Sequence, residues 1–318
     1  MNIFISGLAK LFHVHLGQHG EAKPASIFII GPEAAGKTVF ATMLNEYVGR
    51  NPQTGLVFRA VDIETKKYLA REYDVLKKGE WPTQTKGKLV ALNWIWDANG
   101  RTSNVSLIDP PGHEIRLELC GGSNSLQILD KIKGADLLIL LVDLYGHQKD
   151  NKEKQIENAW IVEHVLNHVK GWQSLLLAVT KADMLTGSLP QSQWANRTEV
   201  LQLVKTMMPD LNLTGYMSKL FSDNCRVLAF SSVTTTGNQA QDGKLVRLPK
   251  SPLASAGINQ VVTSVLDAFK RKSQAEEEGW RNRIRRMPRK VIGIVCCVLG
   301  LIVAYLAYLL YWYVITRS

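Results

Sequence analysis

The feature that most constrains the fold of this chain is a glycine-rich octapeptide between an apolar run and a helical pattern. The octapeptide reads Gly31-Pro32-Glu33-Ala34-Ala35-Gly36-Lys37-Thr38. The apolar run Ser26–Ile30 ends directly before it, and the helical pattern begins at Thr38. A helix that begins at such a loop directs its free N–H groups and the positive end of its dipole toward the loop. The sequence therefore predicts a buried strand, a phosphate-binding loop and a helix in succession.

The octapeptide matches GxxxxGK[ST], a pattern in which each polar side chain has a defined task. Lys37 reaches the β- and γ-phosphates of a nucleotide, and the Thr38 hydroxyl is a ligand for Mg²⁺. Backbone N–H groups hold the other phosphate oxygens. The nucleotide-binding residues predicted from this loop are Gly31, Glu33, Ala34, Ala35, Gly36, Lys37 and Thr38.

A second motif follows the apolar run Val105–Ile108, about 70 residues after the loop, and reads Asp109-Pro110-Pro111-Gly112-His113-Glu114. A carboxylate at the end of a strand can hold Mg²⁺, directly or through water. Gly112 allows the backbone to approach the γ-phosphate because it has no side chain. Such a segment by itself is an ordinary turn, but its place after the loop predicts a second part of one phosphate site.

A third motif, Thr180-Lys181-Ala182-Asp183, follows the apolar run Leu175–Val179. The Asp183 carboxylate can accept both the ring N–H and the exocyclic amine of guanine. Adenine lacks that pair of donors, so a guanine preference is expected. The Lys181 stem can cover the base, and the backbone near Ser231 and Ser232, after the run Val227–Phe230, can read the guanine oxygen.

Short apolar runs alternate with helical patterns from Ala25 to about Lys272. Further runs lie at Leu89–Trp96 and Leu137–Val142. Helical patterns lie around Thr38–Val48, Ser123–Ile132, Glu153–Val169, Glu199–Met208 and Ile258–Lys272. This alternation predicts an α/β fold with a mostly parallel sheet and helices on both faces. Two long connections, Gly49–Glu80 and Thr186–Asp223, are expected to carry some helix.

The order and spacing of these motifs resemble the Ras-like class of P-loop GTPases over Ile27–Lys272. The resemblance implies GTP or GDP as ligand and Mg²⁺ as cofactor. The segment at Asp109–Glu114 is similar to the DTPGHE-type motif of translation-factor GTPases, which implies that His113 orients the attacking water. The class also has a threonine that closes over Mg²⁺ and the γ-phosphate, and Thr85 is our choice for it, with Thr83 as the alternative.

The segment around Trp81-Pro82-Thr83-Gln84-Thr85 also resembles the WPxxT switch motif of the bacterial double-GTPase-like group. By these matches the catalytic residues are His113, Thr85 and Lys37, and the Mg²⁺ ligands are Thr38, Thr85 and Asp109. Glu33 and Ala34 depart from the glycines common in this class, and Thr180 replaces an asparagine. No arginine can be assigned as an internal finger, so slow hydrolysis without a partner is expected.

The C-terminal part of the chain differs in composition from the rest. Val291–Ile315 is 25 residues long without a charge, more than the ~20 that a membrane-spanning helix needs. Lys270–Lys290 carries nine basic and three acidic residues, whereas the whole chain has a net charge of +10. Basic residues stay on the cytosolic side, so a single-pass C-terminal anchor with a cytosolic GTPase domain is expected. The basic stem indicates membrane lipid, and not nucleic acid, as a partner.

These observations predict five segments: an amphipathic N-terminal segment (1–24), a GTPase domain (25–272), a basic stem (273–290), a transmembrane helix (291–315) and a short tail (316–318). The N-terminal segment either packs on the domain or lies on the membrane surface. The four cysteines form no metal or disulfide pattern. The predicted function is a membrane-anchored, Mg²⁺-dependent GTPase switch with a protein effector or activating partner. The alternative is a GTP-binding membrane scaffold whose nucleotide state controls assembly.

Overall fold

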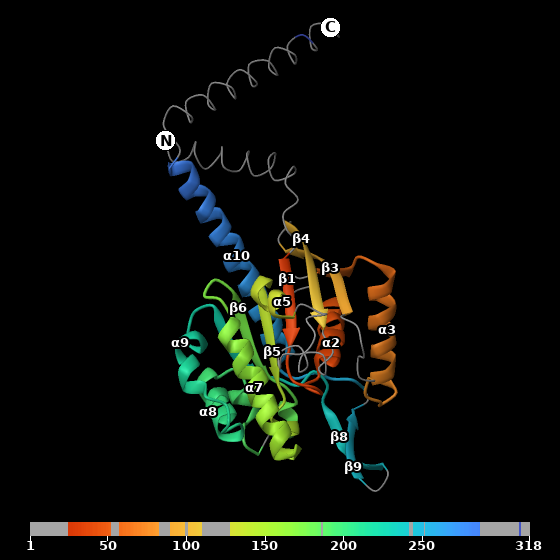
Figure 1. The fold of residues 1–318 in the computed structure, drawn as a ribbon. Coiled ribbons are helices and arrows are strands. Elements are labelled where there is room, and N and C mark those ends of the chain that lie inside the picture. The colour runs from red at the N-terminus through yellow and green to blue at the C-terminus, as the bar shows by residue number, and fades with distance from the viewer. Residues whose placement is uncertain are drawn as a thin grey trace. The chain divides into compact units, whose positions relative to one another are not determined.

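The computed structural model describes residues 25–51, 57–82, 90–98, 101–109, 128–185, 187–241, 244–250, 252–286 and 312. The chain divides into two compact units, Met1–Ala268 and Phe269–Ser318. The first unit holds the sheet and most helices, as Figure 1 shows, and α10 (Ile258–Arg286) runs from the first unit into the second. The predicted N-terminal segment, the tail and the span 291–315, except Trp312, lie outside the described residues. Within the described ranges, none of the helices has the length and apolar character that crossing a bilayer requires.

The main sheet has seven strands in the order β2-β3-β4-β1-β5-β6-β7. Their bounds are β1 (Ala25–Ile30), β2 (Val57–Ala60), β3 (Val90–Ala98), β4 (Arg101–Asp109), β5 (Leu137–Val142), β6 (Ser174–Val179) and β7 (Cys225–Ala229). Strands β4, β1, β5, β6 and β7 are parallel neighbours, whereas β2 and β3 extend the sheet antiparallel beside β4. The predicted α/β fold with a mostly parallel sheet is confirmed.

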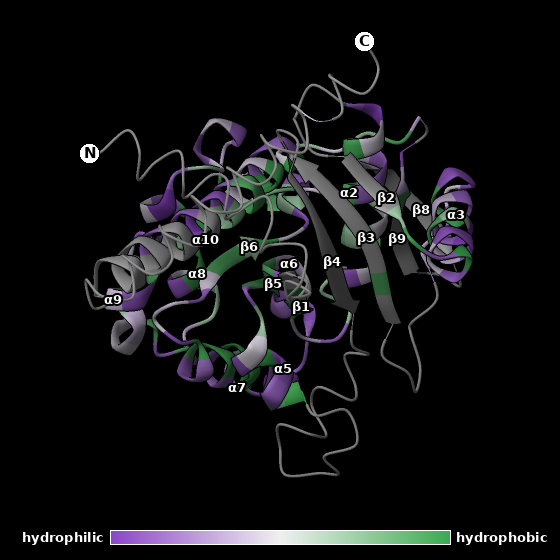
Figure 2. Ribbon diagram, turned by 90° about the horizontal axis from the view of Figure 1, so that it is seen from above, coloured by the Kyte–Doolittle hydropathy of each residue, from purple (hydrophilic) through white to green (hydrophobic). Residues whose placement is uncertain are grey.

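The central strands are apolar because helices cover both faces of the sheet. Every residue of β5 and β6 is buried, and Figure 2 shows β6 as a hydrophobic strand, in contrast to the mostly hydrophilic helix α3 (Ile63–Lys77). Alternate residues of β1, Phe28 and Ile30, belong to a core that includes residues of α5 (Ile128–Gly134), α7 (Lys152–His168) and α8 (Arg197–Met207). On the opposite face, Phe40 of α2 (Lys37–Arg50) packs edge-on against Phe230.

Polar side chains cap the N-termini of several helices. The side chains of Asp62, Asn151 and Asn196 accept hydrogen bonds from backbone N–H groups in the first turns of α3, α7 and α8. Asp143 does the same for the short helix α6 (Leu144–Lys149). Such caps satisfy N–H groups that have no partner within the helix. Short helices η2 (Ala182–Leu185), η3 (Gln191–Gln193), η4 (Leu213–Tyr216) and α9 (Met217–Leu220) complete the connections after β6 and α8.

A two-stranded antiparallel hairpin, β8 (Thr235–Gln241) and β9 (Lys244–Pro249), follows β7 and was not predicted. It projects from the end of the domain below α2 in Figure 1. Next to its base lies a small core of Met43, Leu76, Val233 and Ile258, against which Trp81 packs. This small core connects helices α2 and α3 with the segment between β7 and the hairpin.

Candidate functional site

The predicted motifs converge at one edge of the sheet, where the parallel strands reach their carboxyl ends. The glycine-rich loop follows Ile30 of β1, and Asp109 is the last residue of the neighbouring strand β4. Phe28 pairs with Ile108 in the register of these strands, so Asp109 is level with Ile29, two residues before the loop begins at Gly31. Thr180 follows β6, and the segment with Ser231 follows β7. Ligands of open α/β sheets bind at this edge.

Glycine is required at the start of the loop because the neighbouring strand is close. A Cβ atom on Gly31 would lie less than 3.0 Å from the carbonyl oxygen of Leu141 in β5, a separation that Cβ atoms essentially never show. Gly36, at the other end of the loop, is the N-cap of α2 and has a φ of 85° in the left-handed region. Between them, Ala34 has a φ of 62°. The loop is therefore held in a conformation that L-residues rarely adopt.

The side chain of Lys37 is folded back against the loop that precedes it. Lys37 is 7% exposed, and its Nζ donates hydrogen bonds to the carbonyl oxygens of Gly31 and Pro32, both at 3.1 Å. No acidic residue lies in the first turn of α2. A buried ammonium group and a helix N-terminus without a neighbouring acid in its first turn create a local positive field, which favours an anionic ligand.

Lys181 joins the base motif to the phosphate loop. Its Nζ donates to the carbonyl oxygen of Ala34 at 3.1 Å and forms an ion pair with Asp143, which follows β5. Lys181 has a φ of 56°, and Ala34 and Lys181 are the non-glycine residues with positive φ among those described. Backbone strain of this kind costs free energy and collects at functional sites. The contact between two such residues from different motifs marks this edge as the site.

Asp183 is held by three donors from the segment after β7. Its Oδ1 accepts from the Ser231 hydroxyl at 2.6 Å. Its Oδ2 accepts from the backbone N–H of Thr235 at 3.1 Å and from the Thr235 hydroxyl at 3.0 Å. Thr180 and Ser232 are buried beside these residues, and the backbone N–H of Thr180 donates to Val142 at 2.9 Å. The structure thus brings the predicted base residues together.

Two residues of this site were not predicted from the sequence. Asp143 follows the apolar run 137–142 as directly as Asp109 follows its own run, so its position at a strand end was a usable signal. Thr235 lies beyond the last recognised motif, in the unpredicted hairpin, and no pattern in the sequence indicates its bond to Asp183.

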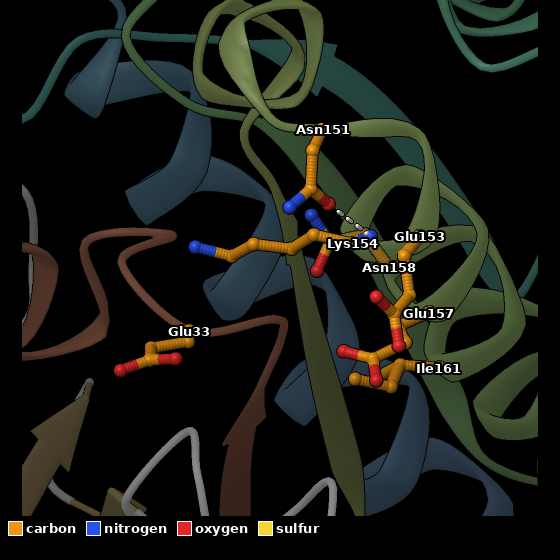
Figure 3. A pocket seen from close by; sticks show the side chains of 7 residues that line it. All are labelled: Glu33, Asn151, Glu153, Lys154, Glu157, Asn158 and Ile161. Carbon is orange, nitrogen blue, oxygen red and sulfur yellow. Dashed lines mark hydrogen bonds between the residues drawn. The ribbon is translucent and has the colours of Figure 1, made fainter.

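A polar cavity of about 260 Å³ lies between the glycine-rich loop and the N-terminal part of α7. Figure 3 shows Glu33 on the loop side and Lys154 extending from the helix toward it. The other lining residues are Asn151, Glu153, Glu157, Asn158 and Ile161. Glu33 therefore faces a cavity at the phosphate loop, and does not pack into the core.

Several predicted residues fall outside the described part of the chain. Thr83, Thr85, Gly112 and His113 are not described, and only the backbone of Asp109 is. Among the described residues, no group of three or more His, Cys, Asp or Glu side chains is arranged to hold a metal ion.

No known family model matches the sequence, and no curated protein matches it. Solved structures that resemble the fold include the three described next. The signal recognition particle receptor SRb-GTP/SRX complex from Chaetomium thermophilum is 16% identical, with a TM-score of 0.40 over 71% of this chain and 100% of that chain. The bacterial selenocysteine-specific elongation factor EF-Sec is 16% identical, with a TM-score of 0.37 over 78% of this chain and 29% of that chain.

The translation elongation factor SelB from Methanococcus maripaludis, in complex with the GTP analogue GppNHp, is 14% identical. Its TM-score is 0.34 over 79% of this chain and 35% of that chain. Each of the three is 16% identical or less, with a TM-score below 0.5.

Proposed function

We propose that this chain is a membrane-anchored, Mg²⁺-dependent GTPase that works as a molecular switch and hydrolyses GTP to GDP and phosphate. The observation that carries the proposal is the contact between two separate motifs. The Lys181 ammonium donates a hydrogen bond to the Ala34 carbonyl, and this bond joins the base motif directly to the phosphate loop. A nucleotide is the ligand class that has a phosphate chain for one motif and a base for the other.

The phosphate end of the ligand would lie over the N-terminus of α2. Loop N–H groups and the helix dipole would hold the phosphate oxygens. The Lys37 ammonium, which now binds the carbonyls of Gly31 and Pro32, would turn to the β- and γ-phosphates. Because Lys37 is already buried at this position, little side-chain freedom is lost when the phosphates bind.

The base end would lie at Asp183. A carboxylate is acceptor-only when ionised, which suits the two donors of guanine and not the acceptor at the same edge of adenine. Ser231 orients this carboxylate through its bond to Oδ1. The guanine preference therefore rests on a carboxylate that the fold holds in a fixed orientation.

Mg²⁺ is the metal that the donor set fits. Thr38 is the second residue of α2 and Asp109 ends the strand beside β1, and both offer hard oxygen ligands. When bound, Mg²⁺ would neutralise charge that develops on the phosphates during transfer.

Hydrolysis and switching are proposed from the sequence motifs. His113 would orient the attacking water, and Thr85 would close over the γ-phosphate and leave it after hydrolysis. A protein partner would bind the two conformations of this segment with different affinity. The membrane anchor at 291–315 would keep the event at a cytosolic membrane face.

A nucleotide competition assay on the full chain in detergent tests the base assignment. Asp183→Asn should weaken GDP binding and favour xanthosine diphosphate, because the amide places a donor where guanine also has donors. Asp210→Asn is the matched control, since Asp210 pairs with Lys152 on an exposed surface. If ADP competes as well as GDP against the unmodified chain, the guanine assignment is wrong.

A single-turnover assay separates the GTPase from the scaffold. GTP hydrolysis should require Mg²⁺, and His113→Ala should slow it while leaving GTP binding intact. Thr85→Ala, and not Thr83→Ala, should reduce the discrimination between GTP and GDP. Tight GTP binding without any Mg²⁺-dependent turnover would favour the scaffold.

A further inference from the structure

We propose that the Thr235 hydroxyl competes with guanine for the Asp183 carboxylate, so that binding of the base releases this hydroxyl at the first residue of the β8–β9 hairpin. The inference rests on the proposed function, because it specifies how that site responds to its base. Its basis is the number of donors around one carboxylate.

The carboxylate of Asp183 has about four lone-pair positions, two on each oxygen. Three donors already occupy three of them: the Ser231 hydroxyl on Oδ1, and the N–H and hydroxyl of Thr235 on Oδ2. Guanine brings two more donors, its ring N–H and one hydrogen of its 2-amino group. Five donors exceed the acceptor capacity of the group, so one of the present bonds must be lost when guanine binds.

The bond from Ser231 is the one that stays. The Ser231 hydroxyl has a single hydrogen, and both Asp183 Oδ1 at 2.6 Å and the Val233 carbonyl oxygen at 3.0 Å are within its reach. Hydrogen bonds to a charged acceptor are shorter and stronger than neutral ones, so the hydrogen points to Asp183. The 3.0 Å bond from the Thr235 hydroxyl is longer, and it shares Oδ2 with the Thr235 N–H.

The position of Thr235 in the chain links its hydroxyl to the hairpin. It is the first residue of β8, and its neighbour Thr234 is bound by its backbone to Ala254 at 2.8 Å and to Lys250 at 2.9 Å. These backbone bonds hold the base of the hairpin, and the Thr235 side chain follows directly after it. Val233, two residues before, packs in the small core with Trp81, which opens the segment of the proposed switch threonine. Occupancy of the base site is thereby linked to the hairpin.

Inosine diphosphate is the discriminating probe, because its base has the ring N–H but no 2-amino group. It brings one donor, and four donors fill the carboxylate without any loss. Thr235→Val keeps the shape of the side chain and the backbone N–H, but it removes the hydroxyl donor. With guanine bound, four donors then remain, which equals the number of acceptor positions on the carboxylate. We therefore expect Thr235→Val to bind GDP about tenfold more tightly, while its affinity for inosine diphosphate changes less than about twofold.

The measurement is calorimetric titration of the full chain in detergent with GDP and with inosine diphosphate. Thr234→Val is the matched control, because the hydrogen bonds described for Thr234 are made by its backbone.

Two results of the titrations would overturn the inference, and a third would overturn the proposed function. Weaker or equal GDP binding by Thr235→Val would overturn the inference, because Thr235 would then only position Asp183. An equal gain for both nucleotides would also overturn it, since the gain would not depend on the 2-amino group. If the unmodified chain binds neither nucleotide, the proposed function itself fails, which is a different result.

Discussion

The glycine at the start of the phosphate loop gives the most quantitative prediction. In Gly31→Ala, the new methyl group would meet the Leu141 carbonyl oxygen at less than 3.0 Å, the Leu141 carbonyl carbon at 3.2 Å and the Leu141 Cβ at 3.3 Å. An ordinary contact begins at 3.4 Å, so strands β1 and β5 must separate by at least about 0.4 Å at the centre of the sheet. The contacts are mainly with backbone, which cannot rotate away as a side chain does.

Overpacking in a well-packed interior costs about 1–3 kcal/mol, and backbone contacts place this variant near the upper end. For a domain of this size, about 3 kcal/mol lowers the melting temperature by about 6–12 °C. Gly49→Ala is the matched control. Nothing lies within 4 Å of its added Cβ, and it is in helix α2, so it should raise stability by about 0.5–1 kcal/mol.

The assay is thermal unfolding of the full chain in detergent, followed by far-ultraviolet circular dichroism without nucleotide. The two alanine variants should move the melting temperature in opposite directions. If Gly31→Ala melts within about 1 °C of the unmodified chain, the close approach of the loop to β5 is wrong.

Two further predictions concern the Asp143 carboxylate and two histidines, His147 of α6 and His164 of α7. Asp143→Asn should lower stability by about 1 kcal/mol or less, because it removes the ion pair with the partly exposed Lys181. Asp143→Ala should cost about 1 kcal/mol more in chemical denaturation, because it also removes the acceptor for the Gly146 N–H. Burial lowers the pKa of His147 and of His164 below 6.5, so the unfolded chain binds more protons than the folded chain as pH falls below about 6.5. The free energy of unfolding should therefore fall between pH 7.5 and 5.5, and less steeply in His147→Gln; an equal slope would contradict this.

The sequence predicted the elements whose pattern is set by burial. The apolar run 137–142 is strand β5 residue for residue, and the predicted helix at Glu153–Val169 is α7 within one residue at each end. Parallel strands covered on both faces must be apolar throughout, so their ends are visible in the sequence. The same reasoning placed the loop with Lys37 and the motif with Asp183 after strands whose ends the sheet brings to one edge.

The elements that were missed carry no long apolar run in their sequence. Strand β2 has four residues at the end of the sheet, and strand β8 holds two threonines and two glutamines among its seven residues. Edge strands and hairpins are fixed by pairing with distant residues, and such pairing leaves no periodic pattern. The bond between Thr235 and Asp183 joins residues 52 positions apart, so only the folded chain brings them together.

The central claim is that a guanine nucleotide binds where the loop Gly31–Thr38 meets Lys181 and Asp183. Calorimetric titration of the full chain in detergent with Mg²⁺ and either GDP or ADP tests it most directly. The account predicts one GDP per chain, binding at least about 100-fold tighter than ADP because of the two donors of guanine, and loss of GDP binding in Lys37→Ala. Equal affinity for ADP and GDP, or unchanged GDP binding by Lys37→Ala, would contradict it.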